Sequence, residues 1–185
     1  MNNSEQKTYP DLMVDIETLD TTATATIMSI AAVPFDLVTG DTSADPFHVT
    51  LDFYKQIEQG RTTSIETILW WGGQYESVQL AVMEGKADLL ETLLSLTKYI
   101  IKHMEREFCI WSNSPSFDLA ILKNAYGRCM DVPWTYKQER DVRTILEIAK
   151  RKGCQFAPAS YSHIPLDDAL EQISKVHKAY KHLEK

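Results

Sequence analysis

The sequence is poor in cysteine and in cationic residues, and it has no long apolar run. Its three cysteines are odd in number and widely spaced, which indicates neither a disulfide framework nor a zinc site. No stretch reaches membrane-spanning length and no basic-then-apolar leader opens the chain, so we expect a soluble, cytoplasmic protein without membrane contacts. Lys and Arg number 19 against 26 Asp and Glu, giving a formal net charge of −7. This charge argues against a module that binds nucleic acid through a broad cationic surface.

Length and patterning predict one α/β domain over residues 1–185, with residues 1–10 as a loose N-terminal arm. Hydrophobic residues make up 44% of the chain and charged residues 24%, as in ordinary globular proteins. Alternating or continuous apolar runs predict five strands, at residues 12–18, 27–33, 47–53, 108–111 and 138–142. Helical spacing and capping residues predict helices at 64–71, 87–104, 114–126, 143–152 and from 165 onward. This order of elements predicts a mixed five-stranded sheet flanked by helices.

Two acids interrupt the first apolar strand. Asp15 and Glu17 are two residues apart, so on a strand they point to the same face while Val14 and Ile16 pack on the other. Their Cα atoms would lie about 6–7 Å apart, a span that suits two divalent ions about 3.5–4 Å from each other. Hard oxygen ligands of this kind favour Mg²⁺ or Mn²⁺. An amphipathic strand with a wet polar face is the alternative interpretation.

Two further acids and one histidine follow predicted secondary-structure boundaries. Asp118 lies one turn into the helix predicted from residue 114, just after a buried strand, where a purely structural role at the helix start is the alternative. Asp168 lies one turn into the helix that Pro165 opens, and His163 lies in the loop before it. A loop histidine beside a carboxylate can act as a general base, because its pKa lies near working pH. An exposed loop histidine without a role is the alternative.

Together, these patterns resemble the three motifs of the DEDDh 3′–5′ exonucleases, in the DnaQ-like, ribonuclease H-like superfamily. The first motif is residues 14–18, the second runs from Asn113 to Asp118, and the third is residues 163–169. A smaller bacterial and phage branch of 3′–5′ exoribonucleases and exonuclease VIII-like proteins is also similar, at residues 15–19, 27–30, 59–61, 68–71 with Gln74, and 140–144. The resemblance implies a ribonuclease H-like fold and covers nearly the whole chain.

The resemblance also implies a mechanism. Four carboxylates would hold two Mg²⁺ or Mn²⁺ ions, and His163 would deprotonate the water that attacks the terminal phosphodiester. Nucleoside 5′-monophosphates would leave one at a time. The four implied ligands are Asp15, Glu17, Asp118 and Asp168.

Substrate contacts are expected from residues near these motifs. Thr18 and Leu19 would touch the terminal nucleotide, and Trp70 or Trp71 would stack on a base, although adjacent tryptophans point apart and at least one should belong to the core. The remaining candidates are Gln74, Asn113, and Arg140 with Asp141 and Arg143 for phosphate contact or bracing.

The expected substrates are single-stranded RNA or DNA 3′ ends, with RNA or RNA overhangs preferred because of the narrower branch. Three alternatives stay open at this stage. These are an exodeoxyribonuclease of phage or prophage DNA metabolism, a catalytically silent ribonuclease H-like binding module, and a metal phosphodiesterase acting on a small nucleotide. Dimers are common in the superfamily, so the resemblance suggests a homodimer.

Overall fold

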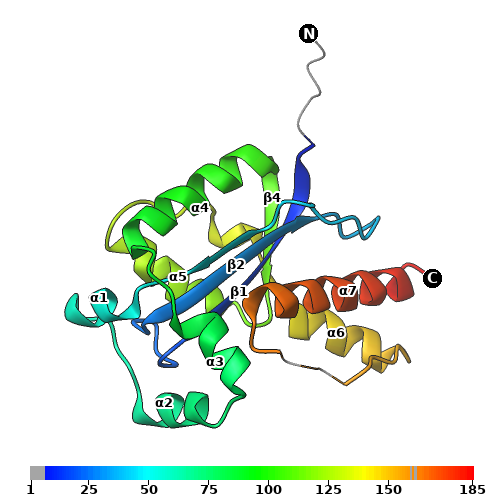
Figure 1. The fold of residues 1–185 in the computed structure, drawn as a ribbon. Helices are drawn as coiled ribbons and strands as arrows, with labels where there is room; N and C mark the ends of the chain where they lie inside the picture. The colour runs from blue at the N-terminus through cyan, green and yellow to red at the C-terminus, as the bar shows by residue number, and fades with distance from the viewer. Residues whose placement is uncertain (1–6, 159, 161) are drawn as a thin grey trace.

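A five-stranded mixed sheet forms the centre of the protein (Figure 1). The computed structural model describes residues 7–158, 160 and 162–185. The strands are β1 (Tyr9–Thr18), β2 (Ile27–Phe35), β3 (Phe47–Thr50), β4 (Met104–Ser112) and β5 (Glu139–Asp141). Their order in the sheet is β3-β2-β1-β4-β5. The strand pairs β1–β2 and β2–β3 are antiparallel and the pairs β1–β4 and β4–β5 are parallel, which confirms the predicted mixed sheet.

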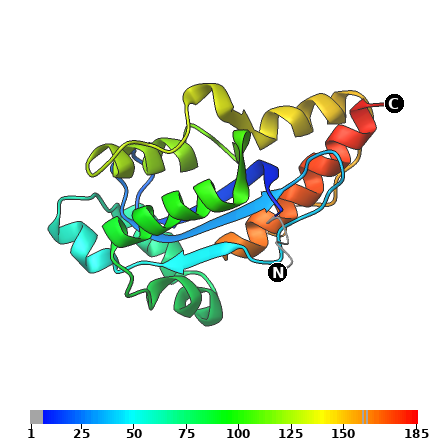
Figure 2. The same ribbon diagram turned by 90° about the horizontal axis from the view of Figure 1, so that it is seen from above.

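Helices cover both faces of this sheet (Figures 1 and 2). One face carries α4 (Leu89–His103) and α5 (Asp118–Gly127), and the other carries α6 (Val142–Arg151) and α7 (Pro165–Leu183). Three shorter helices follow β3, namely α1 (Phe53–Glu58), α2 (Ile65–Gly72) and α3 (Glu76–Met83), and a 3₁₀ turn, η1 (Tyr136–Gln138), precedes β5. Among the described helices, none combines the length and the low charge that crossing a membrane requires.

Strand alternation in β1 divides the core into two layers. Leu12, Val14 and Ile16 pack with α4 and α5, whereas Met13 packs with α7. Asp15 is on the same side as Met13, at the end of the strand where the apolar packing stops. The sheet therefore holds its acids on the α7 side.

The second strand continues through Pro34, where the sequence predicted that it would end. Beyond Ala32 the strand no longer pairs with β3, and the Pro34 carbonyl accepts a hydrogen bond from the Ser43 N–H. In an antiparallel strand the N and O of one residue point to the same side, so the N–H that Pro34 lacks would not have bonded β1. The proline therefore removes no hydrogen bond from the sheet.

Other boundaries also differ from the sequence prediction. The third strand ends at Thr50, because Asp52 caps the unpredicted helix α1 by accepting hydrogen bonds from two backbone N–H groups. The fourth strand is longer than predicted and starts directly after α4. In the predicted N-terminal arm, Tyr9 and Pro10 already belong to β1, while residues 1–6 lie outside the described residues.

The helix predicted from residue 114 begins four residues later. Residues 114–117 form a turn, in which the Ser114 carbonyl accepts from the N–H groups of Phe117 and Asp118. Asp118 is thus the first residue of α5 instead of lying one turn inside it. The three cysteines, Cys109, Cys129 and Cys154, are free, as their spacing predicted.

Candidate functional site

A cavity of about 340 Å³ opens where β1 and β4 end and α7 begins. Residues that are far apart in the sequence meet in it, because the parallel strands β1 and β4 bring their carboxyl ends to one edge of the sheet. The lining includes all five residues of the predicted acidic and histidine motifs, with Asn113 and two residues that the sequence did not single out for this role. The lining residues are Asp15, Ile16, Glu17, Asn113, Ser114, Phe117, Asp118, Arg143, His163, Asp168 and Gln172.

Neighbouring groups hold two of the acids in place. The Gln172 Nε2 donates a hydrogen bond of 2.7 Å to the Asp15 Oδ1, and both side chains are more than nine-tenths buried. The backbone N–H of Ser114 donates to the Asp118 Oδ2 at 3.3 Å, so the first residue of α5 stabilises the turn that precedes the helix. These contacts fix one oxygen of each carboxylate in the cavity.

Asp168 shapes the loop that carries His163. Its Oδ1 accepts from the Ser162 N–H at 2.8 Å and the Ser162 Oγ at 3.0 Å, and its Oδ2 accepts from the His163 N–H at 3.1 Å. His163 has a φ of 56°, in the left-handed region that non-glycine residues rarely adopt. The loop thereby brings one ligand atom each of Glu17, His163 and Asp168 within 4.8 Å of one another.

Burial and mutual repulsion raise the pKa values of the acids. Burial raises the pKa of Glu17 to about 9, and the negative charges of Asp15 and Asp168 add to the shift. Burial, with the charge of Asp118, raises the pKa of Asp15 well above its usual range, although the hydrogen bond from Gln172 opposes the shift. Burial also raises the pKa of Asp118 to about 6. The site therefore gathers more negative charge than it neutralises by itself.

This donor set fits hard divalent cations. Carboxylate oxygens are the ligands that Mg²⁺ and Mn²⁺ prefer, and such ions would counter the repulsion that raises the carboxyl pKa values. The four carboxylates could hold them, and the imidazole of His163 lies close enough to Glu17 and Asp168 to be a ligand or a proton acceptor.

The two adjacent tryptophans have different environments. Trp71 is 1% exposed and its Nε1 donates to the Thr18 carbonyl at 3.0 Å, so its ring has no open face for a base. Trp70 is 44% exposed, and its ring meets the His163 ring edge-on with centroids 4.7 Å apart. Trp71 therefore belongs to the core, and Trp70 is the one of the two with an exposed surface, beside His163 but outside the lining of the cavity.

Other predicted substrate contacts are less accessible than expected. Thr18 and Leu19 are each 5% exposed, because the strand ends in an irregular step after Glu17 and the chain turns inward. The Thr18 hydroxyl already donates to the Asp20 carbonyl, and the Leu19 side chain packs against Trp71. These two side chains thus support the site from beneath.

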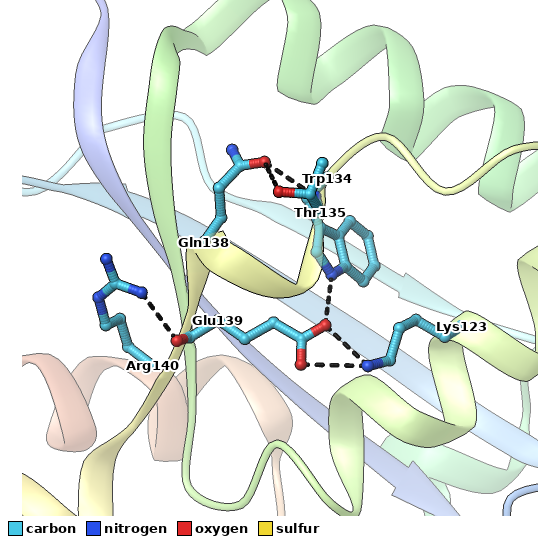
Figure 3. A network of polar contacts seen from close by, with 6 residues as sticks. All are labelled: Lys123, Trp134, Thr135, Gln138, Glu139 and Arg140. Carbon is cyan, nitrogen blue, oxygen red and sulfur yellow. Dashed lines mark hydrogen bonds and ion pairs between the residues drawn. The ribbon is translucent and has the colours of Figure 1, made fainter.

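Arg140 is turned away from the acidic cavity. Its Nη1 donates to the carbonyls of Lys137 and Glu139, and the Glu139 carboxylate in turn accepts from Lys123 and from the Trp134 Nε1 (Figure 3). This network ties β5 to α5 at the edge of the sheet. Arg140 lines a separate cavity along β4, so the structure does not bring it to the other predicted site residues. Gln74, which donates to the Trp70 carbonyl, is not among the lining residues either.

Two residues that line the cavity, Gln172 and Arg143, lie outside the three sequence motifs. Gln172 lies four residues after Asp168 on α7, and this spacing on one helix face is the signal that could have identified it. Arg143, which the sequence suggested only as a phosphate or bracing residue, donates to the Ser114 hydroxyl at the rim of the cavity.

The sequence profile of a family described as the "3'-5' exoribonuclease Rv2179c-like domain" matches residues 10–180. A comparison with curated protein sequences found no match.

Several solved structures share the fold at low sequence identity. Cell-death related nuclease 4 aligns with a TM-score of 0.65 and 15% identity over 94% of this chain and 64% of that protein. Apo exonuclease I aligns with a TM-score of 0.67 and 12% identity, over 95% of this chain and 42% of that protein. The zinc-bound complex of E. coli exonuclease I with single-stranded DNA aligns with a TM-score of 0.63 and 14% identity, over 97% and 41%. The chain thus spans less than two thirds of these relatives.

Proposed function

The chain belongs to the Rv2179c-like family of 3′–5′ exoribonuclease domains, and we propose that it is a metal-dependent exonuclease of single-stranded 3′ ends. It hydrolyses the terminal phosphodiester and releases nucleoside 5′-monophosphates one at a time. The observation that carries this proposal is the convergence of four carboxylates and one histidine in a single cavity of the fold.

Four side chains provide the metal ligands. Asp15, Glu17, Asp118 and Asp168 would hold two Mg²⁺ or Mn²⁺ ions, and the raised pKa values of the first three support a site that is completed by cations. When bound, the ions supply positive charge for the phosphodiester and favour ionisation of the attacking water. The zinc-bound exonuclease I complex, which has a similar fold, carries a divalent ion.

His163 acts as the general base. Its imidazole lies beside Glu17 and Asp168 and accepts the proton of the attacking water. Asp168 holds the backbone of the loop at Ser162 and His163, so the imidazole and the carboxylate keep their relative positions. The edge-on contact with the Trp70 ring limits the rotation of the imidazole.

RNA ends are the proposed preferred substrate, since the family description specifies an exoribonuclease. DNA ends are the second candidate, because the exonuclease I relatives include complexes with single-stranded DNA and with a dT13 oligonucleotide. Both candidates use the same cavity and the same chemistry. They differ in whether a contact with the ribose 2′-hydroxyl contributes to binding.

The test is degradation of 5′-labelled RNA and DNA of the same sequence, with Mg²⁺, Mn²⁺ or chelator. We expect a metal-dependent ladder that shortens from the 3′ end and is lost in Asp15→Ala, Asp168→Ala and His163→Ala. Asp167→Ala is the matched control, because Asp167 is the exposed neighbour of Asp168 and lies outside the cavity. Absence of cleavage of both substrates with either ion would contradict the proposal and favour a catalytically silent binding module.

A further inference from the structure

A second cavity adjoins the acidic one on the side of α6. Its volume is about 560 Å³, within the usual range for small-molecule sites. Asn113 and Arg143 line both cavities, so the two are neighbours. The other lining residues come from α6, α7 and the segment between them, and they are Leu146, Glu147, Lys150, Phe156, Ala157, Pro158 and Lys175. We call this space the α6 cavity.

Cationic and apolar groups share the α6 cavity. Arg143, Lys150 and Lys175 contribute three positive charges against the single carboxylate of Glu147. Lys175 is paired with Glu171, whereas the side-chain ammonium of Lys150 makes no hydrogen bond or ion pair with another described residue. The ring of Phe156 is half-buried and packs against the core. A site that combines cationic groups with an apolar surface suits a nucleotide, whose phosphate is charged and whose base is flat and apolar.

The opposite side of the acidic cavity, toward α2 and α3, has no cationic residues and exposes apolar ones. From residue 62 to residue 85, the stretch that includes α2 and α3, the chain has three glutamates and no Lys or Arg. Ile65 and Leu69 of α2 are 72% and 71% exposed, and Trp70 of the same helix contacts His163. The α2–α3 pair and α6 lie on opposite sides of the start of α7 (Figures 1 and 2). The acidic cavity is thus flanked by an apolar side and a cationic side.

This asymmetry indicates how a strand would lie across the site. The 3′-terminal nucleoside carries only the phosphate that is cleaved, so it needs no further cation. Every nucleotide upstream adds one phosphate, and cationic side chains are the groups that stabilise phosphates most strongly. Resting on the proposed exonuclease function, we infer that the α6 cavity binds the phosphodiester on the 5′ side of the cleaved one, through Arg143 and Lys150. The terminal nucleoside then lies toward Trp70.

The test compares two chain lengths. A dinucleotide has only the phosphodiester that is cleaved, whereas an octanucleotide also has the upstream ones. We expect Lys150→Glu to raise the KM for the octanucleotide about tenfold and to leave dinucleotide cleavage within about twofold of the unmodified protein. The salt dependence of octanucleotide binding should also become shallower, with the log–log slope changing by about 0.7 for one lost phosphate contact on a single strand.

Lys137→Glu is the matched control. Lys137 is an exposed lysine in the other cationic cavity, along β4, with Arg106 and Arg140. We expect it to leave the KM of both substrates unchanged. Loss of octanucleotide affinity in Lys137→Glu but not in Lys150→Glu would overturn the inference, and so would an equal loss for both chain lengths in Lys150→Glu.

Binding without cleavage separates this inference from the proposed function. Fluorescence anisotropy of a labelled octanucleotide in chelator measures affinity whether or not the protein is a nuclease. Weaker binding by Lys150→Glu than by Lys137→Glu supports the α6 cavity even if no product forms. Equal binding by both variants refutes the cavity assignment even if the unmodified protein degrades the substrate.

Discussion

Removal of divalent ions should make the stability of the folded protein depend strongly on pH. The acidic cavity collects Asp15, Glu17, Asp118 and Asp168 with few compensating charges. Without cations, the fold must either keep some of these groups protonated or tolerate their repulsion. Raising the pH from about 5 to about 8 in the presence of chelator should therefore lower the stability of the folded protein.

Glu17 contributes strongly to the expected effect, because folding raises its pKa from 4.5 to about 9, and the raised pKa of Asp15 acts in the same direction. The folded state binds this proton more tightly than the unfolded state, so the stabilisation is complete below pH 4.5 and is lost as the pH rises toward 9. Each pH unit in this window removes about 1.4 kcal/mol, or about 4 kcal/mol between pH 5 and 8. Glu17 is partly exposed, and solvent screening should reduce the measured loss to about 2–3 kcal/mol. Asp118, whose pKa rises to about 6, adds to the lower part of the window.

Urea unfolding followed by circular dichroism measures this loss at each pH. In chelator, the free energy of unfolding should fall across the window, and added Mg²⁺ should restore it. Glu17→Gln should flatten the pH dependence and raise the stability of the metal-free protein at pH 8, while Glu66→Gln, which alters an exposed acid of α2, should change neither. A free energy of unfolding that stays constant with pH in chelator would refute the account of the cavity as a repulsive cluster.

Three further predictions concern residues around the site. Gln172→Leu removes the hydrogen bond to Asp15 and should weaken Mn²⁺ binding about tenfold, as measured by calorimetry; unchanged affinity would show that the hydrogen bond has no role. Trp70→Ala should lower kcat several-fold through the loss of its contact with His163, and Trp70→Phe should recover most of it; equal losses in both variants would contradict a positioning role. Gly85→Ala should destabilise the fold by about 2 kcal/mol in urea unfolding, because a Cβ there would lie 2.4 Å from the backbone of Leu51, and a neutral effect would contradict this close packing.

Much of the fold and the core of the site could be predicted, because their signals are local. Asp15 and Glu17 share a face through strand alternation alone, and Pro165 begins α7 at the predicted residue. His163 and Asp168 then come together because they flank the same helix start. Local patterns placed these residues near element boundaries, and the resemblance to the three exonuclease motifs implied that they form one site.

The remaining features depend on tertiary packing, which a local pattern does not encode. Trp70 and Trp71 are identical in type and adjacent, and only the docking of α2 on β1 decides which one is buried. Ser114 and Pro115 have the appearance of a helix start, but Asp118 draws the Ser114 N–H into a turn instead. Arg140 and Arg143 are three residues apart, yet β5 directs the first toward the sheet edge and α6 directs the second toward the cavity.

The hydrogen bond between Gln172 and Asp15 joins residues 157 positions apart. Asp15 belongs to β1, which leaves the ribosome before the other described elements, whereas Gln172 and Asp168 belong to α7, which leaves after them. Domains fold as units, and the β1 carboxylates have no α7 partner until that helix has emerged. A nascent chain that stops before α7 therefore has no assembled acidic cavity. The protein should be inactive toward nucleic acid, including the messenger being translated, until α7 docks.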